Sequence, residues 1–459
     1  MSMVVQHNMQ AANANRMLGI TSGAQAKSTE KLSSGYKINR AADDAAGLTI
    51  SEKMRKQIRG LDKASSNAQD GVSSVQTAEG ALTEVHSMLQ RMNELAVQSA
   101  NGTNSSDDRQ AIQDEVDQLT TEIDRVAETT KYNEIYLLKG DNSNTKNVYM
   151  KGHDAGLKGS LTDGAKSATF TMDELKSGDK VTIAGKEYSI GSTLAETKAT
   201  YAAAADGEKV TIDGTEYTVV GTTGTEDAAA NKLKITSLDA KVKAGSTVSY
   251  KTTTAKAMTD VDNNGIDDDS SIISKDVAES KIKAELLTAN NIGTVNQAAT
   301  VEDAVTANGK TSYTINKGYA TVADTLSFNL HVGADADMTN KITVDIDTMN
   351  SANLGIKGIN VKDASGTEAT YAIDAIADAV AKVSSQRSAL GAVQNRLEHT
   401  IDNLDNISEN TSSAESRIRD TDMAKEMVNY SKNNILAQAG QSMLAQANQS
   451  NQGVLSLLQ

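Results

Sequence analysis

Small and apolar residues recur in the N-terminal part of the chain at alternating spacings of three and four, the pattern of a coiled-coil seam. Twelve successive seam positions hold only such residues: Leu61, Ala64, Ala68, Gly71, Val75, Ala78, Leu82, Val85, Leu89, Met92, Ala96 and Ser99. At about 1.5 Å per residue, the segment predicts one helix of about 55–60 Å. The Asn-Gly-Thr-Asn segment at residues 101–104 predicts its end.

A second helix is predicted directly after this break. A serine can cap it, and Asp107 and Asp108 lie in its first turn, where the helix dipole favours negative charge. Its apolar positions again follow spacings of four and three: Ile112, Val116, Leu119, Ile123 and Val126. The short connection predicts that the two helices are antiparallel neighbours.

The C-terminal third of the chain carries a third seam, interrupted by Arg387 and Gln394. Its apolar positions are Ile373, Ile376, Val380, Val383, Leu390, Leu397, Ile401 and Leu404. One seam on each of three helices predicts a core shared between the two ends of the chain. We expect the helix near residue 90 to lie against the helix near residue 395.

The middle of the chain, from about Gly140 to Thr325, has alternating patterns rich in Thr, Gly, Asp and Lys that predict strands. Residues 178–191 recur as residues 207–221, and each copy has a turn dipeptide, Ala184-Gly185 or Asp213-Gly214, between two β-branched runs. Each copy predicts a hairpin. The alanine-rich residues 201–207 between the copies suggest a short helix.

The predicted fold is therefore mainly α. Both chain ends form a long antiparallel helical coiled-coil bundle, and one or two β-rich (α+β) domains are inserted between them. A last pair of strands within residues 326–349 is assigned to the bundle as a β-hairpin, because it leads into the C-terminal seam.

The composition fits long helices, since the chain has no proline to interrupt them. A second explanation for the missing proline is passage of the chain through a channel in an unfolded state, because slow X–Pro isomerisation would hinder refolding. The absence of cysteine excludes disulfides and thiolate metal sites. A net charge of −15 argues against a nucleic-acid partner.

No run of 18 apolar residues and no Sec-type signal pattern occurs, so we expect no membrane insertion and no cleaved signal peptide. The five histidines form no zinc pair, and neither a P-loop nor a nucleophile-elbow motif appears. We therefore expect no enzymatic activity and no cofactor.

One acidic segment resembles a calcium loop. Asp260, Asp262, Asn264 and Asp268 occupy ligand positions of such a loop, with Gly265 at its turn. The position that normally holds a bidentate glutamate is Ser271, so an acidic surface turn is the alternative interpretation.

Several long motifs at both ends of the chain, in the same order, resemble bacterial flagellin, and the C-terminal region is similar to flagellins of the Gram-positive type. These motifs lie in residues 23–61, 89–104, 391–404 and 412–448. The resemblance implies three parts: residues 1–43 with 420–459 as an inner helical domain at the filament core, residues 44–140 with 326–419 as a helical rod domain with its β-hairpin, and residues 141–325 as inserted variable surface domains.

The resemblance also implies a function. The chain would polymerise with itself into the extracellular filament of the bacterial flagellum for motility, after export by the flagellar type III system. Its other expected partners are an export chaperone, the filament cap and the hook-junction proteins. A hook-filament junction protein or a hook-associated protein is the alternative; a flagellin with an enzymatic insert and an unrelated coiled-coil adhesin are less consistent with the motifs.

The C-terminal tail continues the three-and-four spacing, but about half of its seam is Gly, Ala and Ser. So little apolar surface predicts that both chain ends are disordered in the monomer and fold on assembly. The residues expected to drive polymerisation are Leu436, Met443, Ala447, Val454, Leu457 and Leu458.

The family is also recognised by Toll-like receptor 5, and the matching receptor-binding residues here are Arg91, Leu95 and Glu115. Arg91 and Leu95 share a helix face by their spacing of four, and they lie off the seam. We therefore expect both to face away from the core. Contact between filament subunits is the alternative use of this surface.

Overall fold

The computed structural model describes residues 8–259 and 264–456, with side chains described for residues 8–259 and 264–450. The described chain is mainly helical and forms two compact units. The first unit comprises Met1–Ser73, Asn329–Thr343 and Val393–Gln459, and the second comprises Ser74–Phe328 and Val344–Ala392. Each unit therefore combines segments that lie far apart in the sequence.

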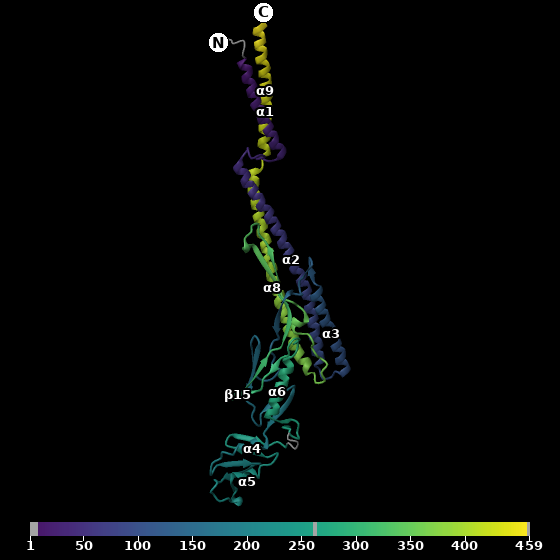
Figure 1. Ribbon diagram of the computed structural model, residues 1–459, viewed down its shortest axis with the longest axis vertical. Coiled ribbons are helices and arrows are strands. Elements are labelled where there is room, and N and C mark those ends of the chain that lie inside the picture. The colour runs from purple at the N-terminus through teal and green to yellow at the C-terminus, as the bar shows by residue number, and fades with distance from the viewer. Residues whose placement is uncertain (1–7, 260–263, 457–459) are drawn as a thin grey trace. The chain divides into compact units, whose positions relative to one another are not determined.

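Two very long helices, α2 and α8, contribute residues to both units, and the terminal helices α1 and α9 belong to the first. Figure 1 shows α1 and α9 side by side. The α-helices are α1 (Met9–Ser34), α2 (Ala45–Ser99), α3 (Ser106–Thr129), α4 (Leu194–Ala199), α5 (Ile235–Asp239), α6 (Lys275–Asn290), α7 (Ser351–Leu354), α8 (Thr367–Arg419) and α9 (Met423–Ser456). Short 3-10 turns are η1 (Ala228–Ala230) and η2 (Met338–Asn340).

The α2 seam is confirmed, because all twelve of its predicted positions are buried. In the first unit, Leu61 and Ala64 pack with Leu404 of α8. One turn further on, Ala68 packs with Leu397. Small residues along the seam allow the two backbones to approach closely.

The expected register of the two seams is wrong. A Cβ atom at Gly71 would lie 3.3 Å from Leu397 Cδ1, so the part of α8 near residue 395 lies against the part of α2 near residue 70. In the second unit, Arg387 donates a hydrogen bond to Glu79 (3.1 Å). Heptad spacing identifies the buried face, but every heptad offers an equivalent register. Polar pairs such as Ser65 Oγ to Asp405 (2.9 Å) distinguish among these registers.

Helix α3 begins as predicted. Ser105 is its N-cap, and its side chain accepts from Asp108 N while the Asp108 carboxylate accepts from Ser105 N. This reciprocal capping box satisfies two backbone donors that the first helical turn leaves unpaired.

The strands form six small sheets. The strands are β1 (Lys131–Tyr132), β2 (Ile135–Tyr136), β3 (Asp141–Tyr149), β4 (Ser160–Asp163), β5 (Ser167–Asp173), β6 (Lys180–Ile183), β7 (Lys186–Gly191), β8 (Lys209–Ile212), β9 (Thr215–Val219), β10 (Lys232–Leu233), β11 (Thr247–Tyr250), β12 (Thr253–Lys256), β13 (Ile272–Ser274), β14 (Thr300–Val301), β15 (Val305–Ala307), β16 (Lys310–Asn316), β17 (Tyr319–Asp324), β18 (Leu326–His331) and β19 (Lys341–Ile346). Their orders are β1-β2, β10-β9-β8-β11-β12, β13-β7-β6, β14-β16-β5-β4 with β15 on β16, β17-β3, and β18-β19.

The inserted region leaves and rejoins the helices through the antiparallel pair β3 and β17, in which Tyr149 lies opposite Tyr319. The predicted pair of strands within residues 326–349 is confirmed as β18 and β19.

Both predicted hairpins are confirmed. They are β6–β7 and β8–β9, each joined by its predicted two-residue turn. All four turn residues have positive φ, from 47° to 78°, as the hairpin turn that matches strand twist requires. The short helix predicted at residues 201–207 is wrong, because these residues form turns and the helix, α4, lies directly before them.

Two of the hydrophobic cores formed by described residues lie mainly in the inserted region. Phe170, Ile282 and Tyr313 lie in one core, which packs α6 with the sheet of β14, β16, β5, β4 and β15. Tyr201, Val210 and Leu238 lie in the other, around the sheet of β10, β9, β8, β11 and β12. The three-part division of the chain at residues 43, 140, 325 and 419 stays a prediction.

The core around Tyr201, Val210 and Leu238 has an acid-sensitive group at its edge, the carboxylate of Glu208. The hydrogen bond from Tyr250 Oη, with others from Ala205 N (2.8 Å) and from Lys251 Nζ (2.9 Å), lowers the pKa of Glu208 to about 2. Because the folded-state pKa is below the ordinary value of 4.5, the stabilisation is complete above that value and is lost as the pH falls towards 2.

We expect Glu208→Gln to lower the melting temperature of this core at neutral pH. Acidification from about pH 4.5 to 2 should then lower the melting temperature of the variant less than it lowers that of the wild type. Thermal melts across this range measure both effects. Glu216→Gln, which removes an exposed carboxylate paired with Lys209 (2.7 Å), is the matched control and should melt like the wild type. A wild-type pH dependence in the Glu208 variant would contradict this assignment.

Candidate functional site

The terminal helices α1 and α9 bury very little of their apolar surface against each other. Ser28 is the one buried side chain of α1, and α9 has none among its described side chains. The exposed large apolar side chains of the pair are Met9, Met17, Ile20, Met423, Met427, Val428, Ile435, Leu436 and Met443. We call these nine residues the terminal apolar surface.

The predicted polymerisation residues lie on or near this surface. Leu436 and Met443 are 47% and 60% exposed, and Ala447 is partly buried. Val454 lies in α9, beyond the described side chains. Leu457 and Leu458 lie outside the described residues.

The two terminal helices approach each other closely where α9 has a glycine. A Cβ atom at Gly440 would lie 3.4 Å from Leu18 Cδ1. Near the end of the pair, Asn8 Nδ2 donates to Ala447 O (3.1 Å), while the Asn8 side chain also caps α1. The pair is thus aligned by small residues and a polar contact, and its large apolar side chains stay at the surface.

A compact joint holds the terminal pair to α2 and α8 within the first unit. Lys37 N donates to Arg419 O (2.6 Å), and Thr421 N donates to Gly35 O (2.9 Å). The Arg419 guanidinium lies 4.8 Å from the centre of the Tyr36 ring. It also contacts Glu52 (2.7 Å), and its hydrogen bond lowers the pKa of that carboxyl.

The second unit carries the predicted receptor-binding residues. Arg91 on α2 donates to Glu115 on α3 (Nε to Oε1, 2.9 Å) and to Glu94 (3.2 Å). About half of the Arg91 side chain and 43% of the Glu115 side chain are exposed. The hydrogen bond from Arg91 to Glu115 raises the pKa of the guanidinium. The structure therefore brings Arg91 and Glu115 together on an exposed surface.

The expectation that Leu95 faces away from the core is wrong, because Leu95 is only 2% exposed. Near this residue α2 has a second neighbour, α3, which contacts it through Glu115 and through Arg109 Nε to Ser99 O (3.2 Å). A helix with two neighbours buries a wider face than a single seam. Spacing from the seam alone therefore misplaced Leu95.

The candidate calcium loop lies partly outside the described residues, since Asp260 and Asp262 fall there. Of the remaining candidates, Asn264 Oδ1 accepts from Ile266 N (2.8 Å), and Asp268 N donates to Thr259 O (3.1 Å). No group of three or more metal-ligating side chains occurs among residues 8–259 and 264–456. The calcium site stays a hypothesis.

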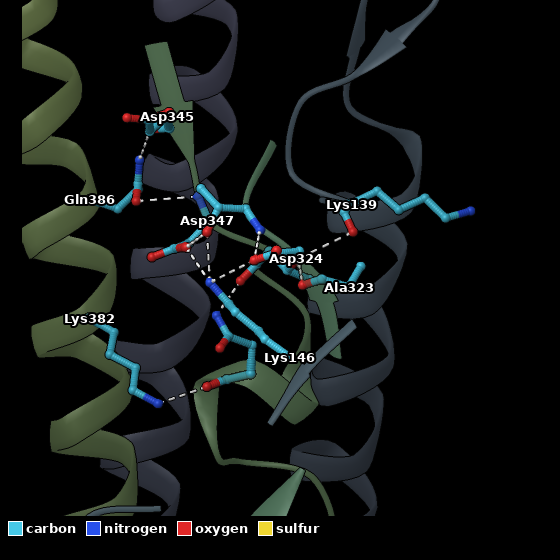
Figure 2. A network of polar contacts seen from close by, with 11 residues as sticks. Lys139, Lys146, Ala323, Asp324, Asp345, Asp347, Lys382 and Gln386 are labelled. Atoms are coloured by element: carbon cyan, nitrogen blue, oxygen red, sulfur yellow. Dashed lines mark hydrogen bonds and ion pairs between the residues drawn. The ribbon is translucent and has the colours of Figure 1, made fainter. Parts of the chain in front are cut away.

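A polar network in the second unit was missed by the sequence analysis (Figure 2). Lys146 Nζ contacts Asp347 (2.8 Å) and donates to Thr325 Oγ1 (2.7 Å), and Gln386 Nε2 donates to Asp345 O (3.1 Å). These contacts connect the strand that begins the insert, the residues that end it, and α8. Partners separated by about two hundred positions leave no local motif, so no sequence signal could have revealed them.

Comparison with known proteins identifies the family. A family model described as the bacterial flagellin N-terminal helical region matches residues 5–143. The bacterial flagellin C-terminal helical region matches residues 373–458. A flagellin from Clostridium tyrobutyricum is 41% identical over 453 residues, which cover 98% of this chain and 100% of that protein.

The chain belongs to the flagellin family. Flagellin B from Vibrio anguillarum is 35% identical to this flagellin over 458 residues and covers it completely. A flagellin from Halalkalibacterium halodurans is 34% identical over 456 residues, or 99% of the chain, and is itself completely covered.

Solved structures resemble this flagellin only distantly. FliC from Burkholderia pseudomallei has 18% identity and a TM-score of 0.27, over 71% of this chain and 99% of that one. The junction protein FlgL from Legionella pneumophila has 14% identity and a TM-score of 0.32, over 81% and 99%. TM-scores this low favour neither a filament subunit nor a hook-filament junction protein. In the described part of this flagellin, every helix is too short or too polar to cross a membrane.

Proposed function

We propose that this chain is the structural subunit of a bacterial flagellar filament and that it polymerises through the terminal apolar surface. Membership of the flagellin family supports the filament role. The observation that carries the proposed mechanism is the exposure of nine large apolar side chains on a pair of helices that bury almost nothing.

The energetics favour burial of this surface between subunits. Fully burying one such side chain stabilises by about 1.5–3 kcal/mol. Ordering the backbone of each terminal residue costs about 1–2 kcal/mol, so a pair that leaves its large side chains in water is marginal alone. Neighbouring copies can supply the missing apolar partners. Because the contacting surfaces differ, such an interface repeats along a helix and does not close.

The same family membership supports export by the flagellar type III system to the extracellular filament, without cleavage of a signal peptide. An export chaperone, the filament cap and the hook-junction proteins would be its other partners. A chain without proline is consistent with passage in an unfolded state.

The filament proposal predicts that Ile435→Asn with Met443→Gln raises the concentration needed for seeded polymerisation by about tenfold or more, because two apolar contacts between subunits are lost. Sedimentation of filaments grown from seeds measures this concentration. The matched control is Val305→Asn, since Val305 is 62% exposed and Ile435 is 65% exposed, but Val305 lies in the insert.

Wild-type polymerisation by the double variant would contradict the proposed interface. A wild-type chain that forms no filament on seeds, and is added only to hook or filament ends, would instead support the alternative role of a hook-filament junction or hook-associated protein.

We also infer that Toll-like receptor 5 recognises the surface around Arg91 and Glu115. Both side chains are about half exposed, and their ion pair fixes a guanidinium between two helices. Charged side chains held in place lose less entropy when they bind a partner. Leu95 is buried one helical turn after Arg91, so it would act on this surface by holding α2 in place and not by direct contact.

Arg91→Ala should weaken receptor binding about tenfold with little change in melting temperature, because exposed ion pairs contribute about 0–1 kcal/mol to stability. Leu95→Ala should weaken binding and also destabilise the fold by about 2–5 kcal/mol, through a cavity. Receptor titration together with thermal melts separates the two effects.

Arg125→Ala is the matched control for Arg91, because Arg125 is also exposed and pairs only along its own helix, with Glu122. Receptor affinity that is equal in the Arg91 variant, the Arg125 variant and the wild type would refute the receptor surface.

A further inference from the structure

A cleft of about 290 Å³ lies in the second unit, between α6, α7 and α8 and the segment that follows β3. Its wall is mostly apolar, with Met150, Ile292 and Leu354 as its largest apolar side chains. Three charged side chains also line it, Lys151, Asp378 and Lys382. A volume of this size is at the lower end of small-molecule sites, which span about 300–1,000 Å³.

The one carboxylate that lines this cleft is paired with a lysine through one of its oxygens. Asp378 Oδ1 contacts Lys151 Nζ (2.9 Å), whereas Asp378 Oδ2 is buried, lies 3.4 Å from His153 Nε2 and has no hydrogen-bond partner among the described residues. Of the neighbouring carboxylates, Asp347 pairs with Lys146 (2.8 Å), and Asp163 pairs with Lys317 (2.5 Å). Each of these three carboxylates thus has its own cation.

Lys382 has no such partner among the described residues. Its ammonium donates to the carbonyl oxygen of Asn353 (2.8 Å), a neutral group (Figure 2). Burial lowers the pKa of the Lys382 amine, although Asp378 and Asp347 oppose this shift. In the described structure neither carboxylate lies at ion-pair distance from this amine, so an anion in direct contact with it would add stabilisation.

We propose that this cleft binds a small monocarboxylate with a short apolar chain, with the carboxylate at Lys382 Nζ and the chain along Met150, Ile292 and Leu354. Charge complementarity selects the carboxylate, because Lys382 is the lining cation without a carboxylate partner in the described structure. The apolar wall and the small volume select the short chain. The site does not depend on polymerisation or on receptor binding.

The chemistry also sets the order of affinity among ligands of one chain length. An alcohol fills the same apolar wall but brings no charge to Lys382. An amine brings a second positive charge next to Lys382 and Lys151. The expected order is therefore hexanoate, then 1-hexanol, then hexylamine.

Methyl NMR of the full chain labelled at methionine tests this order and the location. Hexanoate should shift the Met150 signal in a saturable way and leave that of Met172, a buried methionine outside the cleft, unchanged. Lys382→Met should weaken hexanoate binding about tenfold or more, as expected for losing a charged hydrogen bond. Lys139→Met, which removes a lysine outside the cleft, should bind like the wild type.

A second variant keeps the proposal testable if Lys382→Met does not fold. Ser385→Phe places a ring at the exposed rim of the cleft and keeps the Lys382 ammonium, and it should block hexanoate. Equal binding of hexanoate and 1-hexanol would overturn the proposal. So would unchanged hexanoate affinity in either variant, or a response confined to methionines outside the cleft.

Discussion

The constraint on which the rest of this flagellin depends is the shortage of apolar partners for α1 and α9. The two helices pair with each other, yet their large side chains, including Met17, Ile20 and Ile435, stay more than half exposed. Contacts at Gly440 and Asn8 align the pair without burying these side chains. In the proposed function, neighbouring copies of the chain supply the apolar contacts that these two helices lack.

The rest of the molecule, in contrast, buries many of its large apolar side chains in cores of its own. The seam of α2 is buried along its whole predicted length, and two further cores lie mainly in the insert, one of them with Tyr371 of α8. The joint at Tyr36, Glu52 and Arg419 connects the marginal terminal pair to the buried seam in the first unit. Under the proposed function, such a chain would remain a monomer when dilute and would assemble when a filament end offers apolar partners.

Local patterns predicted much of this fold. Heptad spacing identified the buried face of α2, the serine with two aspartates identified the start of α3, and turn dipeptides identified both hairpins. Each of these features depends on residues within a few positions of one another. The physical rule that creates each feature can therefore be applied to the sequence directly.

The wrong predictions depend on distant segments. The seams could not fix the register of α8 on α2, because every heptad is equivalent until pairs such as Arg387 with Glu79 distinguish them. Leu95 was misplaced because the second neighbour of α2 is not visible in the seam. The candidate sites were predicted only in part. Arg91 and Glu115 were found through a family motif. The contacts of Lys146, and the position of Lys382 without a carboxylate partner among the described residues, arise from tertiary structure.

Hydrogen exchange of α1 and α9, measured by mass spectrometry in the dilute monomer and in the assembled filament, tests the central claim most directly. The account predicts rapid exchange of both terminal helices in the monomer, strong protection in the filament, and protection of the α2 seam in both states. Terminal helices that are as well protected in the dilute monomer as in the filament would contradict it.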